Sequence, residues 1–255
     1  MKFQVLSDQH LESKNNLDFF YDKFNPQADV LLIAGDFCSH NIPLRDIIIK
    51  DKILPNWKTT IMIPGNHDFY GAGVNGNLNS VYFNSFLNMD KNDSGNKIYY
   101  GNNTVLPLDN INIVLSSLWT YVDPVKASVY DKSFSDFRNI YGFNSDFLNN
   151  FYRNSIDFLY SLDTLLCKKN PCIFLTHHLP SYNLISDRYK GRGDNCFFAS
   201  SLDTFICDNT DLINVWVHGH SHDFLDTDIL KTRFIRNPMG HPHERFCDLS
   251  FCFEI

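Results

Sequence analysis

Five short clusters of side chains that can bind metal ions occur in this sequence, and each follows a run of apolar residues. They are Asp8-Gln9-His10, Gly35-Asp36, Gly65-Asn66-His67-Asp68, His177-His178 and His218-Gly219-His220-Ser221-His222. Carboxylate, imidazole and amide groups are the ligands that proteins use for divalent cations. Side chains that follow several strands of an α/β sheet can meet at one edge of that sheet. The pattern therefore predicts metal-assisted chemistry.

In two of the clusters, the spacing of the residues predicts that their side chains point the same way. Asp8 and His10 are two residues apart, so on a continuing strand they would point the same way and could hold one ion. The histidines of 218–222 alternate with small residues, which predicts three rings on one side of an extended segment. The alternative for 218–222 is a histidine-rich surface turn.

Each of the remaining clusters, taken alone, fits either a metal site or an ordinary turn. Gly35-Asp36 places a carboxylate at a strand end, but strand-Gly-Asp is also an ordinary turn. Asn66 offers an amide oxygen to a hard ion and His67 could then face a substrate, whereas the alternative is an Asn-rich turn. Either histidine of 177–178 could be a ligand. Independent turns would have to supply all these groups at successive strand ends, so their joint occurrence favours a metal site.

Composition limits the kinds of protein and partner. The chain has 255 residues and is 44% hydrophobic, which suits one sizeable core, and we expect a single domain over 1–255. Its 22 basic and 29 acidic residues give a formal net charge of -7, which argues against binding long nucleic acids. An anionic substrate would then need bound cations as its source of positive charge.

The predicted localisation rests on the sequence having neither a recognisable signal peptide nor a membrane-spanning run. The chain reaches Asp8 directly after Met1, which leaves no room for the apolar stretch of a signal peptide, and no apolar run approaches a membrane span. Its seven cysteines include no Cys-x-x-Cys pair. We interpret them as buried small side chains in a reducing compartment and expect a cytoplasmic protein without membrane contact.

Short apolar runs alternate with helix-like segments. The runs that we expect to be buried strands are 3–7, 30–34, 60–63, 111–116, 172–176 and 214–217. Helices are expected at 42–54 and at 146–169, where apolar residues recur every three to four positions. Segments 224–229, 232–236 and 249–255 are strand-like and separated by short turns. We expect an α/β fold with a mixed sheet or two packed sheets, and a surface excursion at 71–96 with a short helix near 83–87.

The order of the five clusters resembles the calcineurin-like metallophosphoesterase superfamily. Asp-x-His, Gly-Asp, Gly-Asn-His-Asp, His before Pro and Gly-His-x-His occur in the family's order over 8–222. The segments 118–120, 176–181 and Asn237-Pro238-x-Gly240 also resemble those of small bacterial-type members. That subgroup more often has Arg and Tyr where this chain has Met239 and His241, which leaves both without an assigned role.

The resemblance implies a four-layer α/β/β/α sandwich with mixed sheets and a two-metal centre at the C-terminal strand ends. It implies that the first ion is held by Asp8, His10 and His222 and the second by Asn66, His177 and His220. Asp36 would bridge the two ions. His67 would sit beside the substrate phosphate, with Asp68 as its orienting partner, and His178 and His218 would not be ligands.

Such a centre would make the protein a hydrolase of phosphomonoesters or phosphodiesters. Two cations roughly 3.5 to 4 Å apart can deprotonate a bridging water and present the hydroxide to a phosphorus. The nitrogen-rich ligands favour manganese, iron or zinc over magnesium. The expected substrate is a small phosphorylated molecule, nucleotides included. The alternatives are a non-catalytic metal-binding scaffold, a protein phosphatase and a nucleotide pyrophosphohydrolase.

A loop with three basic residues follows the histidine pair 177–178 and could contact a substrate. Arg188, Lys190 and Arg192 lie in the loop that follows, and we expect Arg188 and Arg192 to contact phosphate or leaving group. The alternative is a solvated loop. Trp119 and Tyr121 could stack on a ring, although aromatic residues after a strand are more often part of the core or its rim.

Overall fold

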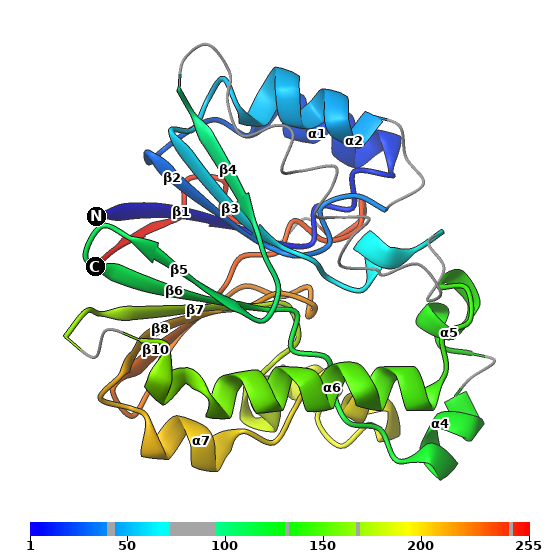
Figure 1. Ribbon diagram of the computed structural model, residues 1–255. Helices are drawn as coiled ribbons and strands as arrows, with labels where there is room; N and C mark the ends of the chain where they lie inside the picture. Colours follow the sequence, from blue (N-terminus) through cyan, green and yellow to red (C-terminus); the bar gives the residue numbers. More distant parts are fainter. Residues whose placement is uncertain (40–43, 72–94, 131–132, 167–168, 245–246) are drawn as a thin grey trace.

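Two β-sheets pack face to face, and helices cover both outer faces, in the computed structural model of the chain (Figure 1). The structure describes residues 1–39, 44–71, 95–130, 133–166, 169–244 and 247–255. Helices α1 (Lys14–Lys23) and α2 (Leu44–Ile48) lie on the first sheet, and α6 (Ser145–Tyr160) and α7 (Asp203–Asp208) lie on the second. This is the four-layer α/β/β/α sandwich that the family resemblance implied, and it confirms the two packed sheets expected from the sequence pattern.

The first sheet carries the N-terminal clusters. Its strand order is β11-β1-β2-β3-β4, with β1 to β4 parallel and β11 antiparallel to β1. The strands are β1 (Lys2–Leu6), β2 (Val30–Ala34), β3 (Thr59–Ile63), β4 (Lys97–Tyr100) and β11 (Cys252–Glu254). Because β1, β2 and β3 run in parallel, the residues that follow them lie at the same edge.

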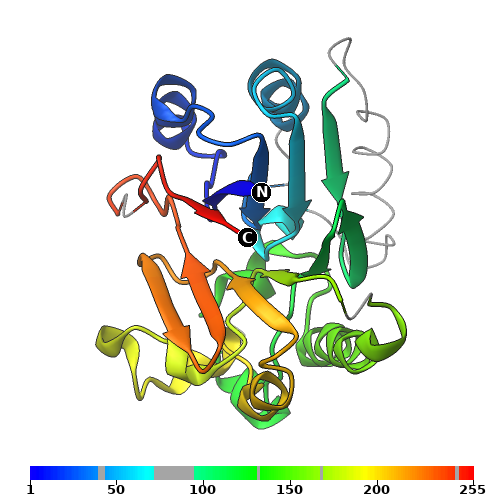
Figure 2. The same ribbon diagram turned by 90° about the vertical axis from the view of Figure 1, so that its left-hand side faces the viewer.

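The second sheet carries the C-terminal clusters. Its order is β5-β6-β7-β8-β10-β9, with four parallel central strands and an antiparallel strand at each edge. The strands are β5 (Thr104–Leu108), β6 (Ile111–Ser116), β7 (Cys172–Thr176), β8 (Ile213–Val217), β9 (Leu225–Ile229) and β10 (Thr232–Arg236). Figure 2 shows the two sheets stacked one above the other. Two short helices, α4 (Pro124–Tyr130) and α5 (Ser135–Asn139), precede α6.

The central strands are apolar throughout because both of their faces are covered. In β2, Leu32 lies in the layer between the sheets, and its neighbour Ile33 lies in the layer beneath α1 and α2. In β7, Ile173 faces the other sheet and Phe174 packs with residues of α6 and α7. Each such side chain stabilises the fold by about 1.5–3 kcal/mol relative to exposure. The sandwich thus has three apolar layers, one between the sheets and one beneath the helices on each outer face.

All six strands predicted from apolar runs are confirmed to within one residue. The segments 224–229 and 232–236 form the antiparallel pair β9 and β10, as expected. The prediction for 249–255 is only partly right, because the strand there is the short β11, which joins the first sheet. Strands β4 and β5 and helices α1, α4, α5 and α7 were not predicted.

The two helix predictions need correction. Of the segment 42–54, residues 42 and 43 lie outside the described residues, and the rest forms the short helix α2 followed by the π-helix η1 (Ile49–Ile53). Helix α6 ends at Tyr160 rather than continuing to 169, because the N–H of Ser161 is shared among three carbonyls and the chain enters a short 3-10 turn. The predicted helix near 83–87, like most of 71–96, lies outside the described residues.

The cysteine prediction is also only partly right. Of the six cysteines in the described ranges, Cys38, Cys172 and Cys196 are buried, whereas Cys207 is exposed. Among the helices that the structure describes, none has the length and apolar character needed to cross a membrane.

Candidate metal centre

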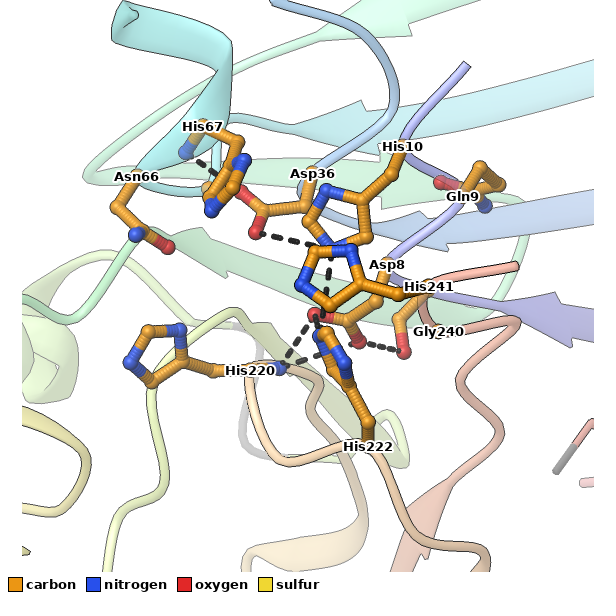
Figure 3. Close-up of polar contacts among 12 residues, drawn as sticks. Asp8, Gln9, His10, Asp36, Asn66, His67, His220, His222, Gly240 and His241 are labelled. Carbon is orange, nitrogen blue, oxygen red and sulfur yellow. Dashed lines mark hydrogen bonds and ion pairs between the residues drawn. The ribbon is translucent and has the colours of Figure 1, made fainter. Parts of the chain in front are cut away.

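Residues from both sheets meet where the parallel strands end. Asp8, Asp36 and Asn66 follow β1, β2 and β3 of the first sheet, and His177 and His220 follow β7 and β8 of the second. Figure 3 shows side chains of both sheets turned toward one another. A Cβ on Gly219 would lie 2.8 Å from Asp8 Oδ2 and from the Ala34 carbonyl oxygen, so glycine is needed for the sheets to approach this closely.

The backbone at these strand ends is left-handed rather than extended. Asp8 has φ 53°, His10 φ 45°, Asp36 φ 54° and His220 φ 66°. Such conformations cost about 1–3 kcal/mol each for residues other than glycine and concentrate at functional sites. Here they are held by hydrogen bonds from Asp8 N to Gly35 O (3.0 Å) and from His10 N to Asp36 O (3.0 Å).

This geometry corrects two predictions about direction. Strand β1 ends at Leu6, so Asp8 and His10 do not reach the site by alternation along a continuing strand. The segment 218–222 is not extended either, because it bends at the positive φ of His220. His220 and His222 face the centre from separate sides, and His218 is buried at the end of β8.

One cluster of ligand atoms, which we call the first cluster, is formed by Asp8, His10 and His222. The Nε2 atoms of His10 and His222 lie 3.2 Å apart. His222 Nε2 lies 3.5 Å from Asp8 Oδ1. His10 Nε2 lies 3.8 Å from Asp36 Oδ2. Nitrogen and carboxylate atoms that converge in this way could hold one cation.

The second cluster is formed by Asn66, His177 and His220. His177 Nε2 lies 3.0 Å from Asn66 Oδ1 and 3.4 Å from Asp36 Oδ1. His220 Nε2 is buried without a hydrogen-bond partner among the described residues, and a ligand atom of this ring lies within 4.8 Å of those of Asp36 and His177. A bound cation would satisfy this nitrogen. Asp36 therefore faces the first cluster with Oδ2 and the second with Oδ1.

Three of the histidines present Nε2 to the centre because their Nδ1 atoms are already engaged. His177 Nδ1 donates to the Ala34 carbonyl at 2.8 Å. His222 Nδ1 lies 2.6 Å from Glu244 Oε2, and His10 Nδ1 lies 3.2 Å from Glu12 Oε1. Metal-binding histidines usually donate the other ring N–H to a carboxylate or carbonyl, which fixes the ring and its tautomer.

The electrostatics of the centre favour added positive charge. Burial raises the pKa of Asp36, but the charges of His177 and His67 outweigh it and hold this pKa well below its usual range. Burial lowers the pKa of His177, yet the charge of Asp36 raises it to about 9. The pKa of His222 is likewise raised to about 10 by Asp8 and Glu244 against burial. Buried carboxylates that draw protons onto neighbouring imidazoles would stabilise a divalent cation for the same reason.

The structure places His177, and not His178, beside Asn66 and Asp36. His178 Nδ1 lies 3.0 Å from the Ser117 carbonyl, and its ring packs on Trp119 with centroids 4.9 Å apart. Burial and the charge of His177 lower the pKa of His178 to about 3, so the ring is neutral. Both spare histidines, 178 and 218, are buried.

His67 stands at the mouth of the centre. Its backbone N–H donates to Asp36 Oδ1 at 2.8 Å, and its ring stacks on Tyr70 with centroids 4.1 Å apart. The His67 Nδ1 atom lies 3.4 Å from Glu12 Oε1. The Asp68 carboxylate accepts backbone N–H groups of Asp36 (2.9 Å), Gly65 (2.7 Å) and Cys38 (3.3 Å), and so ties two strand ends together. Its role as an orienting partner of His67 stays a prediction.

Sequence reasoning missed the carboxylates that hold the ligands. Asp136 Oδ1 accepts from Asn66 Nδ2 at 2.7 Å and from the Tyr70 hydroxyl at 2.7 Å, which leaves Asn66 Oδ1 facing His177. Glu12 and Glu244 hold His10 and His222 as described above. Glu12 is two residues after His10, which was an available signal, whereas only tertiary structure brings Asp136 and Glu244 to the centre.

A cavity of about 230 Å³ opens beside His220 and His222. Leu179, Ile185, Tyr189 and Phe198 give it an apolar wall. Arg192 also lines the cavity, where its guanidinium binds Asp194 through two hydrogen bonds of 3.0 and 2.8 Å.

The other side chains considered for substrate do not line this cavity. Arg188 Nη2 lies 3.5 Å from the carbonyl oxygen of His222, which does line it. Lys190 pairs with Asp187. Trp119 is buried against Phe151 in the core, as expected of an aromatic residue that follows a strand. Tyr121 is exposed.

Comparison with known proteins relates this site to a family. The family described as Calcineurin-like phosphoesterase matches residues 1–224. An uncharacterised protein of Acanthamoeba polyphaga mimivirus is 30% identical over 275 residues, which covers 95% of this chain and 92% of the relative.

Two solved structures share the architecture. The phosphopantetheinyl hydrolase of Mycobacterium tuberculosis has a TM-score of 0.69 at 15% identity and covers 95% of this chain and 90% of its own. TT1561 of Thermus thermophilus has a TM-score of 0.52 at 13% identity and covers 98% of this chain and 90% of its own. Together with the match over residues 1–224, these findings show that the chain belongs to the calcineurin-like phosphoesterase family.

Proposed function

We propose that this protein is a metal-dependent hydrolase of phosphomonoesters or phosphodiesters of small molecules. The observation that carries the proposal is the pair of clusters that share Asp36, with Oδ1 3.4 Å from His177 Nε2 and Oδ2 3.8 Å from His10 Nε2. The first ion would be held by Asp8, His10 and His222, the second by Asn66, His177 and His220, and both by Asp36. Bound ions at such a pair activate water and neutralise charge on phosphoryl oxygens.

His67 supplies the group for the substrate phosphate. Burial lowers the pKa of its ring, but the charges of Asp36 and Glu12 outweigh burial and the net pKa is raised. The His67 ring can donate a hydrogen bond to a phosphoryl oxygen or a proton to the leaving oxygen. Stacking on Tyr70 and the nearby Glu12 carboxylate fix its orientation. His67 thus acts on substrate, and it is not proposed as a metal ligand.

The cavity beside His222 gives the ester's alcohol portion a place to bind. Its apolar wall suits an organic group, and its size suits a small substrate rather than a protein. Arg192 would reach the substrate only by exchanging part of its contact with Asp194. The hydrolase from Mycobacterium tuberculosis is named for phosphopantetheinyl groups, but its 15% identity supports the fold and not a shared substrate.

The donor atoms narrow the expected metals. The two clusters together contain four imidazoles, one amide oxygen and two carboxylates. Imidazole-rich sites prefer manganese, iron or zinc, whereas magnesium prefers oxygen ligands and keeps several waters. We therefore propose two divalent ions drawn from these three metals.

The test is turnover of two synthetic esters. Purified protein supplied with Mn²⁺, Fe²⁺ or Zn²⁺ is assayed on p-nitrophenyl phosphate and bis-p-nitrophenyl phosphate beside a His67→Ala variant. We expect metal-dependent turnover of at least one ester and a loss of roughly 10²–10⁴-fold in kcat in the variant. The exposed His243→Ala variant serves as a matched control and should equal the unaltered protein. If the unaltered protein hydrolysed neither ester faster than His67→Ala does, the proposed hydrolase activity would be refuted. The alternative of a metal-binding scaffold would then remain.

A further inference from the structure

His241 lies beside the first cluster, although no motif in the sequence assigns it a role. Its ring centroid is 4.6 Å from that of His10 and 4.9 Å from that of His222. One ring nitrogen from each of the three histidines lies within 4.8 Å of the others. Figure 3 shows the three rings gathered at one point, next to Asp8 and Asp36.

The backbone around His241 is bound to the same turn that carries Asp8 and His10. Gly240 N donates to the Asp8 carbonyl at 2.9 Å. Asn16 Nδ2 donates to both the Gln9 and the Gly240 carbonyls, each at 2.9 Å. These hydrogen bonds hold the backbone next to His241 against the turn that carries Asp8 and His10.

Glu244 ties His241 to its neighbour in the cluster. Glu244 Oε2 accepts the backbone N–H of His241 at 2.8 Å and also lies 2.6 Å from His222 Nδ1. One carboxylate oxygen thus sets the positions of both histidines. For His222 this is the support that second partners give to metal-binding imidazoles, and for His241 it fixes the backbone that carries the ring.

We propose that His241 is a third imidazole ligand of the first ion, in addition to His10 and His222. The inference rests on the proposed metal centre. Imidazoles that bind one ion at about 2.1 Å, with angles of about 90–110° between them, place their ring centroids roughly 4.5–5.2 Å apart. The three centroid separations here are 4.6, 4.9 and 5.1 Å. The first site then has three nitrogen donors and the carboxylates of Asp8 and Asp36.

The assignment separates His241 from His67. Their ring centroids are 6.2 Å apart, and His67 is stacked on Tyr70 at the first sheet, whereas His241 arrives after β10. Three imidazoles make the first site richer in nitrogen than the second, which has those of His177 and His220. Zinc prefers such nitrogen-rich sites, so the first site should bind zinc more tightly than the second.

The experiment isolates the first site and counts its imidazoles. In a His177→Ala variant, which weakens the second site, Zn²⁺ affinity is measured by competition with a chromophoric chelator, and zinc X-ray absorption counts bound imidazoles. We expect one tight equivalent with three imidazoles. Adding His241→Ala should lower the affinity by at least about 10-fold and leave two imidazoles. The same pair in a His220→Ala background guards against an effect peculiar to one variant.

Two controls and a fold measurement define the outcomes. His243→Ala, an exposed neighbour, should leave zinc affinity unchanged, and His222→Ala should lower it as His241→Ala does. Metal-free melting temperatures establish that each variant folds, and His241→Gln replaces His241→Ala if the alanine variant does not. Unchanged affinity and imidazole count in the folded His241 variant would overturn the proposal, as would the absence of a zinc site in both backgrounds. Zinc binding as expected without ester turnover by the unaltered protein would overturn the proposed function and uphold the ligand.

Discussion

The two clusters that share Asp36 differ in how far the residues that support their ligands are exposed. In the first, the side chain of His222 is 15% exposed, and its partner Glu244 is 20% exposed. In the second, His177 is fully buried, and Asn66 and its partner Asp136 are each 3% exposed. The cavity borders both clusters, through His222 of the first and His220 of the second, but the second is also held by a backbone carbonyl and a buried carboxylate.

This difference has a consequence for how the sites behave. An ion at the second cluster would be held by groups that cannot move without disturbing the sandwich. An ion at the first cluster would depend on Glu244, which is partly exposed and lies outside the buried layers. We therefore expect the two sites to respond separately to changes in their supporting residues and together only to changes in Asp36.

The largest effect is expected from Asp36→Asn, which alters both clusters at once. Loss of the carboxylate charge should remove both ions and lower kcat/KM by more than about 100-fold, because direct ligands matter at least as much as the partners that orient them. Metal content by mass spectrometry, with turnover on the better of the two esters, checks this. Two full equivalents of metal in the variant would refute the bridging position.

Smaller effects, each on a different ion, are expected when the two supporting carboxylates are replaced. Glu244→Ala should weaken only the first ion, and Asp136→Ala only the second, each by roughly 10–100-fold. Asp136→Ala should also lower the free energy of unfolding by about 1–3 kcal/mol, because it leaves buried groups of Asn66 and Tyr70 without their acceptor.

Stepwise metal titration of the two variants, with chemical denaturation, separates these effects. Glu244→Gln and Asp136→Asn keep an acceptor oxygen and serve as conservative controls. If either alanine substitution weakened both ions equally, the clusters would not be independent.

The smallest effect concerns the cavity wall. Arg192→Ala should raise KM by roughly threefold to tenfold with little change in kcat or metal content, because Arg192 is exposed and already paired with Asp194. Lys190→Ala, in the same loop but paired with Asp187 and outside the cavity lining, is the matched control. Equal steady-state constants for the two variants would show that this wall does not contact the substrate.

The sequence was sufficient to predict the sheets and the groups at their ends. Strands such as β2 and β7 are continuous apolar runs because both faces are covered, so they are visible without tertiary information. Strands β4 and β5 were missed because they are partly exposed and their apolar pattern is interrupted. The helix predicted at 146–169 was too long because Leu162 continues the apolar spacing of α6 after that helix has ended.

The parts of the centre that were not predicted depend on contacts between distant segments. Glu244 reaches His222, and Asp136 reaches Asn66, only after both sheets have formed. The left-handed backbone at Asp8 and Asp36 is likewise imposed by hydrogen bonds between strand ends. No local spacing rule contains that information, which is why His241 could be assigned no role from the sequence.

The most direct test of a pair of ions sharing one carboxylate is anomalous diffraction from crystals grown with Mn²⁺. We predict two anomalous peaks, one on each side of the Asp36 carboxylate. The first should contact Asp8, His10, His222 and His241, and the second Asn66, His177 and His220. A single peak, or two peaks of which only one contacts Asp36, would contradict this account.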